Sequence, residues 1–212
     1  MTPPIVRRTG LLDRTVHNRD ARLFLIASED TYAVEQYFDA LQRNGVVDSR
    51  RIRIKALPNE PGGGSDPASV LQRLDIVTRD LDELRPLDER WLCLDVDHWA
   101  TGKHAKNLAR VCQDAEKAGI GLAVSNPSFE LWLLLHFTDE PKETSAACEQ
   151  AIRSLEGSYN KTNLVAERYT AQRVDAAMQR AKALDTDESQ RWPQTTGTRV
   201  YRLVERLPRL RP

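Results

Sequence analysis

Three short apolar segments, separated by stretches with helical spacing, place the strongest constraint on the fold of this chain. The segments cover residues 22–27, 91–94 and 120–124. Apolar residues at helical spacing occupy residues 67–84 and 106–118 between them. Such alternation is typical of an α/β fold, in which helices flank a mostly parallel sheet. The loops at the carboxyl ends of the strands usually carry function in this class, so we expect a site there.

The length of 212 residues suits one medium-sized domain or a domain with a helical extension. Residues 1–20 are polar and arginine-rich with little periodicity, which predicts a flexible N-terminal arm. The alternation of strands and helices predicts an α/β domain over residues 21–140. Helical spacing over residues 162–183 and 198–207 predicts a helical C-terminal part, residues 141–212, packed on the same domain.

Composition and charge indicate a cytoplasmic protein that does not enter a membrane. The N-terminus lacks the apolar core and the cleavage site of a secretory signal, and the longest apolar run, residues 129–137, is far too short to cross a bilayer. The three cysteines are scattered without the pairing of a metal site, so we expect buried thiols. With 31 basic and 31 acidic residues, the formal charges cancel, which argues against broad coating of a polyanion but allows a local basic patch.

An apolar run that ends in two acids, Asp95 and Asp97, is the most informative stretch for function. Successive strand residues point to opposite faces, so these two carboxylates leave the strand end on the same side. Two carboxylates placed in this way can share one divalent cation. Alternatively, an aspartate after a strand organises a turn or caps the following helix.

A third acid, Glu29, follows the first predicted strand. If the sheet brings both strand ends to one edge, Glu29, Asp95 and Asp97 face one space. Crowded carboxylates repel one another, and Mg²⁺ or Mn²⁺ offsets that repulsion and can bind a phosphate oxygen. The alternative is that Glu29 lies near a helix N-terminus and stabilises the helix dipole.

A long motif follows the third apolar run: Ser125-Asn126-Pro127-Ser128-Phe129-Glu130-Leu131-Trp132-Leu133-Leu134-Leu135-His136-Phe137. It closely resembles the Ser-Asn-Pro-x-Phe-Glu-Leu-Trp-Leu-Leu-x-His-Phe signature of RloB-like proteins, an accessory family of bacterial restriction and abortive-infection loci. That family looks like a variant of the Toprim (topoisomerase-primase) fold, with an acid after its first strand and Asp-x-Asp after a later one. Residues 159–161 and 192–207 also resemble regions of the family, so the resemblance covers residues 22–208.

The resemblance implies a metal-dependent, nuclease-like site, because Toprim domains use a glutamate and a pair of aspartates with Mg²⁺ in phosphodiester cleavage or transfer. Asp95 and Asp97 take the place of the aspartate pair and would hold Mg²⁺ or Mn²⁺. Glu29 takes the place of the glutamate, either as a further metal ligand or as the general base.

The first turn departs from the family pattern. The family commonly has Glu-Gly in this turn and a Thr-Glu before the helix, whereas this chain has Glu29-Asp30 and Ala33-Val34. The loop glycine and the second glutamate are therefore missing, although Glu35 lies one position away. This departure keeps a second interpretation open, in which a non-catalytic binding or sensor subunit retains the fold and its acidic pocket is structural.

Glu130, Asn126, Lys161 and His98 complete the candidate site. Glu130 lies in the first turn of the helix that the motif opens, where N–H groups and Asn126 would help to bind a phosphate; the alternative for both residues is ordinary helix capping. Lys161 would neutralise a scissile phosphate, unless it is a solvated surface lysine. His98 would bind substrate, ligate the metal or donate a proton, whereas His136 in an apolar helix is expected to be a packed group.

The residues and the resemblance predict a nuclease of bacterial anti-phage defence that requires Mg²⁺ or Mn²⁺. The substrate is left open between DNA and RNA, including tRNA. The resemblance also implies regulation through an ATPase encoded nearby, and the oligomeric state is open. A weaker alternative is a phosphatase or another phosphotransfer enzyme.

Overall fold

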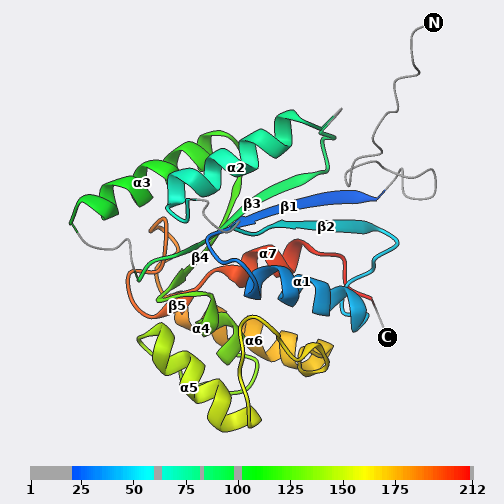
Figure 1. Cartoon of the computed structure of the whole chain (residues 1–212), viewed down its shortest axis with the longest axis vertical. Helices are drawn as coiled ribbons and strands as arrows, with labels where there is room; N and C mark the ends of the chain where they lie inside the picture. The colour runs from blue at the N-terminus through cyan, green and yellow to red at the C-terminus, as the bar shows by residue number, and fades with distance from the viewer. Residues whose placement is uncertain (1–20, 60–63, 82–83, 98–101, 211–212) are drawn as a thin grey trace, which may run out of the picture.

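A five-stranded sheet forms the centre of the computed structural model, in the order β2-β1-β3-β4-β5 (Figure 1). The model describes residues 21–59, 64–81, 84–97 and 102–210, and of residues 102–104 only the backbone; the predicted arm, residues 1–20, lies outside the described residues. The strands are β1 (Arg22–Ser28), β2 (Ile52–Leu57), β3 (Glu89–Asp95), β4 (Gly121–Asn126) and β5 (Gly197–Thr198). β1 to β4 are parallel and β5 is antiparallel to β4, which confirms the predicted α/β fold with a mostly parallel sheet.

Helices cover both faces of the sheet (Figure 1). They are α1 (Ala33–Arg43), α2 (Pro67–Arg79), α3 (Gly102–Lys117), α4 (Phe129–Leu134), α5 (Ser145–Glu156), α6 (Ala171–Leu184) and α7 (Val200–Arg206). α2 and α3 pack on one face, and α1, α4, α5, α6 and α7 bury their apolar residues in the core on the other face. No helix in the described part of the chain combines the length and the apolar character needed to span a lipid bilayer.

β1 shows how the sheet separates these two cores. Phe24 and Ile26 join the cluster that contains α1, whereas Leu23, Leu25 and Ala27 join the cluster that contains α2 and α3. The side chains alternate because successive strand residues point to opposite faces. Burial on both faces explains why the strand reads as a continuous apolar run in the sequence, and it holds the end of β1 firmly in place.

α2 begins where the sequence signals predict it and ends before the apolar spacing does. The Asp66 carboxylate accepts a hydrogen bond of 3.1 Å from the N–H of Ala68, and Pro67 begins the helix, where its missing N–H costs nothing. Apolar spacing runs on to Leu81, yet the helix ends at Arg79. Leu81 still packs against the core, so the buried stripe continues through a turn that is no longer helical.

The C-terminal part contributes to the same core and also to the sheet. Within the predicted helix over residues 162–183, α6 begins only at Ala171, after a short 3₁₀ turn, η2, at Ala166–Arg168. Residues 197–198 form β5, which the sequence did not indicate because two residues are too few to produce a pattern. β5 pairs Ser125 with Thr198 and Asn126 with Gly197.

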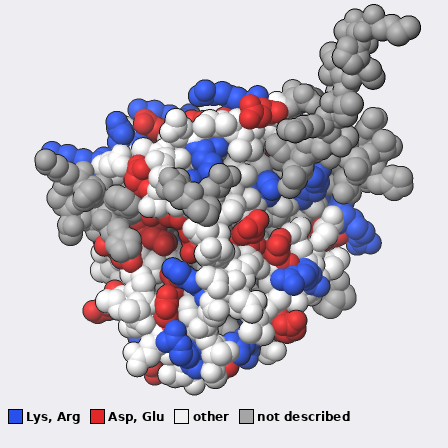
Figure 2. Space-filling model, in the orientation of Figure 1, with Lys and Arg blue, Asp and Glu red and all other residues white. Residues whose placement is uncertain are grey.

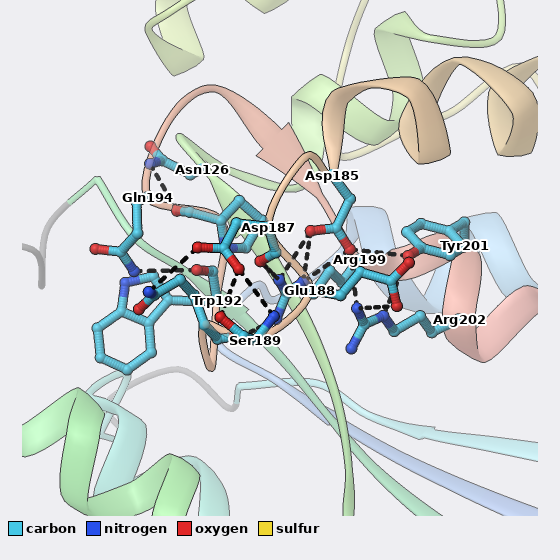
Figure 3. Close-up of polar contacts among 12 residues, drawn as sticks. Asn126, Asp185, Asp187, Glu188, Ser189, Trp192, Gln194, Arg199, Tyr201 and Arg202 are labelled. Carbon is cyan, nitrogen blue, oxygen red and sulfur yellow. Dashed lines mark hydrogen bonds and ion pairs between the residues drawn. The ribbon is translucent and has the colours of Figure 1, made fainter.

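A buried ion pair anchors the C-terminal part (Figure 3). Arg199 donates to Asp185, at 2.8 Å from Nη2 to Oδ1 and 3.0 Å from Nε to Oδ2, and each side chain is 2% exposed. The Tyr201 hydroxyl and the Arg202 guanidinium also donate to Asp185, at 2.8 and 2.9 Å. Arg199 Nη2 further donates to the carbonyl of Asp187 at 2.8 Å. We call Asp185, Arg199, Tyr201 and Arg202 the Asp185 network.

The Asp185 network is expected to make stability depend on pH in acid. Burial alone would raise the pKa of Asp185, but the hydrogen bonds and charges of Arg199, Tyr201 and Arg202 outweigh it and hold the pKa below its usual range. A carboxylate with a lowered pKa adds stability above the pKa of its unfolded form, about 3.9, and that stability is lost as the pH falls further. In urea titrations, the free energy of unfolding should therefore fall more steeply between about pH 5 and pH 3 for the wild type than for Asp185→Asn. Parallel curves would contradict this assignment.

Candidate active site

The carboxyl ends of β1 and β3 lie side by side and bring two acids together. The strands are parallel neighbours, with Ser28 of β1 opposite Cys93 of β3. The Glu29 N–H donates to the carbonyl of Cys93 at 3.4 Å, and the N–H of Asp95 donates to Oε1 of Glu29 at 3.3 Å. Sheet register thus fixes Glu29 next to Asp95, as expected from the positions of both acids after parallel strands.

Asp95 also reaches the start of α4. Its Oδ1 accepts a hydrogen bond of 2.9 Å from the N–H of Phe129, the first residue of that helix. The backbone N–H groups of Val96 and Asp97 donate to the carbonyl of Pro127, at 3.0 and 3.1 Å. The segment after β3 is therefore tied to the turn before α4. It also follows that the N–H of Phe129 serves Asp95 and not a phosphate.

A chain of short oxygen contacts joins Glu130 to Asp97. Glu130 Oε2 lies 2.7 Å from Ser128 Oγ, which lies 2.7 Å from Ser145 Oγ, which in turn lies 2.6 Å from Asp97 Oδ2. Two hydroxyl protons cannot supply three hydrogen bonds, so all three require one more proton on one of the two carboxyl groups at the ends of this chain, Glu130 or Asp97. Burial raises the pKa of Glu130, against the opposing effect of the Ser128 contact. This direction favours Glu130 as the group that carries the proton.

Replacement of Glu130 by glutamine is expected to change the free energy of unfolding by less than about 1 kcal/mol, because the amide keeps the shape and a donor for Ser128. Leucine at the same position should cost about 1–3 kcal/mol, because it leaves the buried Ser128 hydroxyl without this partner. Urea unfolding at neutral pH measures both values. An equal loss in the two variants would show that Glu130 is ionised.

These residues surround a cleft of about 260 Å³ in which negative charge predominates. Six acids, three serines and one lysine line it: Glu29, Asp30, Asp95, Asp97, Glu130, Glu149, Ser65, Ser128, Ser145 and Lys161. In Figure 2, Asp and Glu gather near the middle of the molecule, whereas Lys and Arg are frequent along the upper edge. Burial first, and then the charges of Glu29 and Glu130, raise the pKa of Asp95 well above its usual range.

The acids of this cleft have the type of oxygen donor that a hard divalent cation needs, but they are not arranged around a common point. Carboxylate oxygens are the donors that Mg²⁺ and Mn²⁺ prefer. However, among the residues that the structure describes, no three Asp, Glu, His or Cys side chains are arranged to hold a metal ion. One oxygen of Asp95 is directed to the N–H of Phe129, and one oxygen of Asp97 is directed to the Ser145 hydroxyl. A cation that bound between the two residues would have to use their other oxygens or displace these bonds.

The structure brings most of the predicted site residues into this cleft. Glu29, Asp95, Asp97, Glu130 and Lys161 all line it. Two other predicted residues do not belong to that group. Asn126 turns toward the C-terminal part, where its Nδ2 donates to the carbonyl of Pro193 at 3.0 Å (Figure 3), and His98 lies outside the described residues.

His136 is a packed group in the core, as predicted. Its Nδ1 lies 2.9 Å from the carbonyl oxygen of Trp132, and its Nε2 lies 3.2 Å from the Tyr37 hydroxyl. Burial lowers the pKa of His136 to about 3, so the ring is neutral near neutral pH.

Sequence reasoning missed five of the residues that line the cleft. Asp30 and Ser128 are adjacent to motif residues and could have been found from that position alone. Ser145 and Glu149, one helical turn apart on α5, and Ser65 carry no pattern that marks them. They reach the cleft only because α5 packs against α4 and because the segment before α2 lies beside the strand ends.

The family model for RloB-like proteins matches residues 24–207, which include every residue of the cleft. This chain belongs to the RloB-like family. No curated protein and no solved structure matches the RloB-like chain. The Asp185 network falls within the same matched region, so the family match covers both the cleft and the buried anchor of the C-terminal part.

Proposed function

We propose that this RloB-like protein is a metal-dependent nuclease that hydrolyses phosphodiester bonds of DNA or RNA in the acidic cleft. One observation carries the proposal: six acids line the cleft at the carboxyl ends of β1 and β3, where burial and, after it, the neighbouring carboxylates raise the pKa of Asp95. Such crowding is costly for the fold and is offset when a cation binds. The family membership supports this choice through the resemblance of RloB-like proteins to the Toprim fold.

Each residue has a distinct task in this proposal. Asp95 and Asp97 hold Mg²⁺ or Mn²⁺, and Glu29 either completes the ligand set or accepts a proton from the attacking water. The bound cation supplies positive charge that polarises the phosphate. Lys161, the one cation among the described residues of the cleft, neutralises a phosphate oxygen. Glu130 holds the Ser128 and Ser145 hydroxyls in the chain of contacts that ends at Asp97.

The proposed setting is bacterial anti-phage defence in the cytoplasm, with a partner ATPase that regulates cleavage. This part of the proposal comes from the resemblance of the sequence to loci of restriction and abortive infection. The nucleic acid is DNA or RNA, and tRNA is one candidate.

A second candidate function is a non-catalytic binding or sensor subunit. The observation that favours it is the state of the first turn: Asp30, in the place of a family glycine, accepts hydrogen bonds from the N–H groups of Tyr32 and Ala33 at the start of α1. Asp30 thus has a capping task. Together with the lack of a preformed set of three ligands among the described residues, this is what a structural acidic pocket would show.

The two functions are separated by cleavage of labelled DNA, total RNA and tRNA with Mg²⁺ or Mn²⁺. The wild type is compared with Asp97→Ala and Glu29→Gln, after circular dichroism confirms that each variant folds. Cleavage that is lost in both variants supports the nuclease. No cleavage by the wild type, alone and with a candidate partner ATPase, would overturn the nuclease and favour the binding subunit.

A further inference from the structure

Gln36 on α1 connects the start of that helix to the loop that carries Lys161. Its Nε2 donates to the carbonyl of Tyr32 at 3.2 Å and to the carbonyl of Lys161 at 3.0 Å. Its Oε1 accepts a hydrogen bond of 2.8 Å from the N–H of Leu164. The amide therefore uses two donors and one acceptor to bridge segments more than 120 residues apart in the sequence, with separations of 125 and 128 residues.

The loop itself is a compact turn. The Asn160 side chain accepts hydrogen bonds from the N–H and the hydroxyl of Thr162, at 3.0 and 2.8 Å. The N–H of Asn163 donates to the carbonyl of Asn160 at 3.0 Å. Gln36 contacts this turn at Lys161 and again at Leu164, so one side chain fixes the turn at two points.

Lys161 extends from this turn into the cleft, where all other charged side chains among the described lining residues are acids. No ion pair within 4.0 Å joins it to any acid in the described part of the chain, and its side chain is exposed. The position of its ammonium group is thus set by the backbone of the turn and not by a carboxylate partner. A phosphate that enters the cleft meets six acids and this one lysine.

We propose that Gln36 is a positioning residue that holds Lys161 over the cleft, where the lysine binds a phosphate group of the nucleic acid. This inference rests on the proposed function. Loss of Gln36 removes its hydrogen bonds to the turn, so the backbone that carries Lys161 is no longer held in one position. The contact between the lysine and a phosphate then becomes weaker. Because the contact attracts substrate into an acidic cleft, the loss falls mainly on affinity and KM and less on kcat.

The test is a double-mutant cycle in an Asp95→Asn background, in which cleavage is blocked and binding can be measured. Fluorescently labelled single-stranded DNA, single-stranded RNA and tRNA serve as probes, and fluorescence anisotropy gives Kd. Lys161→Ala should weaken binding about 10-fold or more, as for a lost hydrogen bond to a charged group. Gln36→Ala should weaken it about 3- to 10-fold, and the double variant should bind no more weakly than Lys161→Ala alone.

Asn44→Ala is the matched control, because Asn44 makes the same kind of bridge at the other end of α1. Its Nδ2 donates to the carbonyls of Ala166 and Tyr169, at 2.6 and 3.1 Å, and it does not contact the Lys161 turn. Asn44→Ala should leave Kd unchanged. Hydrogen exchange provides a second readout: the amide of Leu164 should exchange faster in Gln36→Ala and at the wild-type rate in Asn44→Ala.

The outcomes distinguish the positioning role from the proposed function. If Gln36→Ala binds as tightly as the Asp95→Asn parent, or if the effects of Gln36→Ala and Lys161→Ala add, the positioning role is overturned while nucleic-acid binding stands. If Lys161→Ala does not weaken binding, the phosphate role of Lys161 is overturned together with that of Gln36. If none of the three probes binds the parent, both this inference and the proposed function are overturned.

Discussion

Replacing Arg199 with methionine is expected to lower the free energy of unfolding by about 3–5 kcal/mol, as for a buried ion pair that loses one partner. The side chains of Arg199 and Asp185 are each 2% exposed, so the Asp185 carboxylate stays in a place that water does not reach. Tyr201 and Arg202 continue to donate to this carboxylate, but the Arg199 guanidinium, which donates to it through two nitrogens, is gone. Urea unfolding followed by tryptophan fluorescence measures the loss.

Arg206→Met is the matched control for this prediction. Arg206 donates to Glu89 at 2.9 Å, but its side chain is 58% exposed, and exposed ion pairs contribute less than about 1 kcal/mol. The double variant Arg199→Met/Asp185→Leu should recover part of the stability lost in Arg199→Met, since it removes a buried charge that has lost its main partner. Equal losses in Arg199→Met and Arg206→Met would contradict the anchoring role of the Asp185 network.

The second large effect is expected for Asp95→Asn. This substitution should abolish cleavage and yet raise the stability of the metal-free protein. Cleavage should fall at least about 100-fold, because the residue is a proposed metal ligand. The amide keeps an oxygen for the N–H of Phe129, now 2.9 Å from Oδ1, and removes a buried carboxyl group whose ionised form is disfavoured by burial and by the charge of Glu29. We therefore expect the metal-free variant to have a higher free energy of unfolding and a higher Tm than the wild type.

Added metal should reverse the order of stability of the wild type and Asp95→Asn. With Mg²⁺ or Mn²⁺ well above Kd, the wild type should gain stability in proportion to the logarithm of the metal concentration, and Asp95→Asn should gain almost none. Asp114→Asn, which removes an exposed acid on α3 that does not line the cleft, should change neither value. If Asp95→Asn is less stable than the wild type without metal, the repulsion inferred for the cleft is wrong.

Much of the sheet and part of the cleft could be predicted because they depend on short patterns. β1 and β3 are continuous apolar runs, and acids directly after parallel strands meet at one edge of the sheet. That reasoning alone placed Glu29 beside Asp95. The apolar residues of the 125–137 motif lie in the core: Phe129, Leu131, Trp132 and Leu135 are buried, and Phe137 is partly buried against the same cluster.

The remainder depends on contacts between segments that are distant in the sequence. Asparagine is a residue type that often caps helices or binds ligands. The Nδ2 of Asn126 instead donates to the carbonyl of Pro193, 67 residues later in the chain. Ser145 reaches Asp97 across 48 residues, and Gln36 reaches Lys161 across 125. No local pattern records such pairs, because each partner looks like an ordinary polar surface residue until the helices are packed.

The late position of β5 and of Arg199 has a consequence for synthesis on the ribosome. One edge strand of the sheet and the main partner of Asp185 come from residues 197–199, after every described acid and the lysine of the cleft have been made. A nascent chain that stops short of this segment holds all the groups for chemistry but leaves β4 with an open edge and Asp185 without its main partner. Translation of the last segment therefore completes the sheet and the buried ion pair, and products that are truncated before it are expected to be unstable.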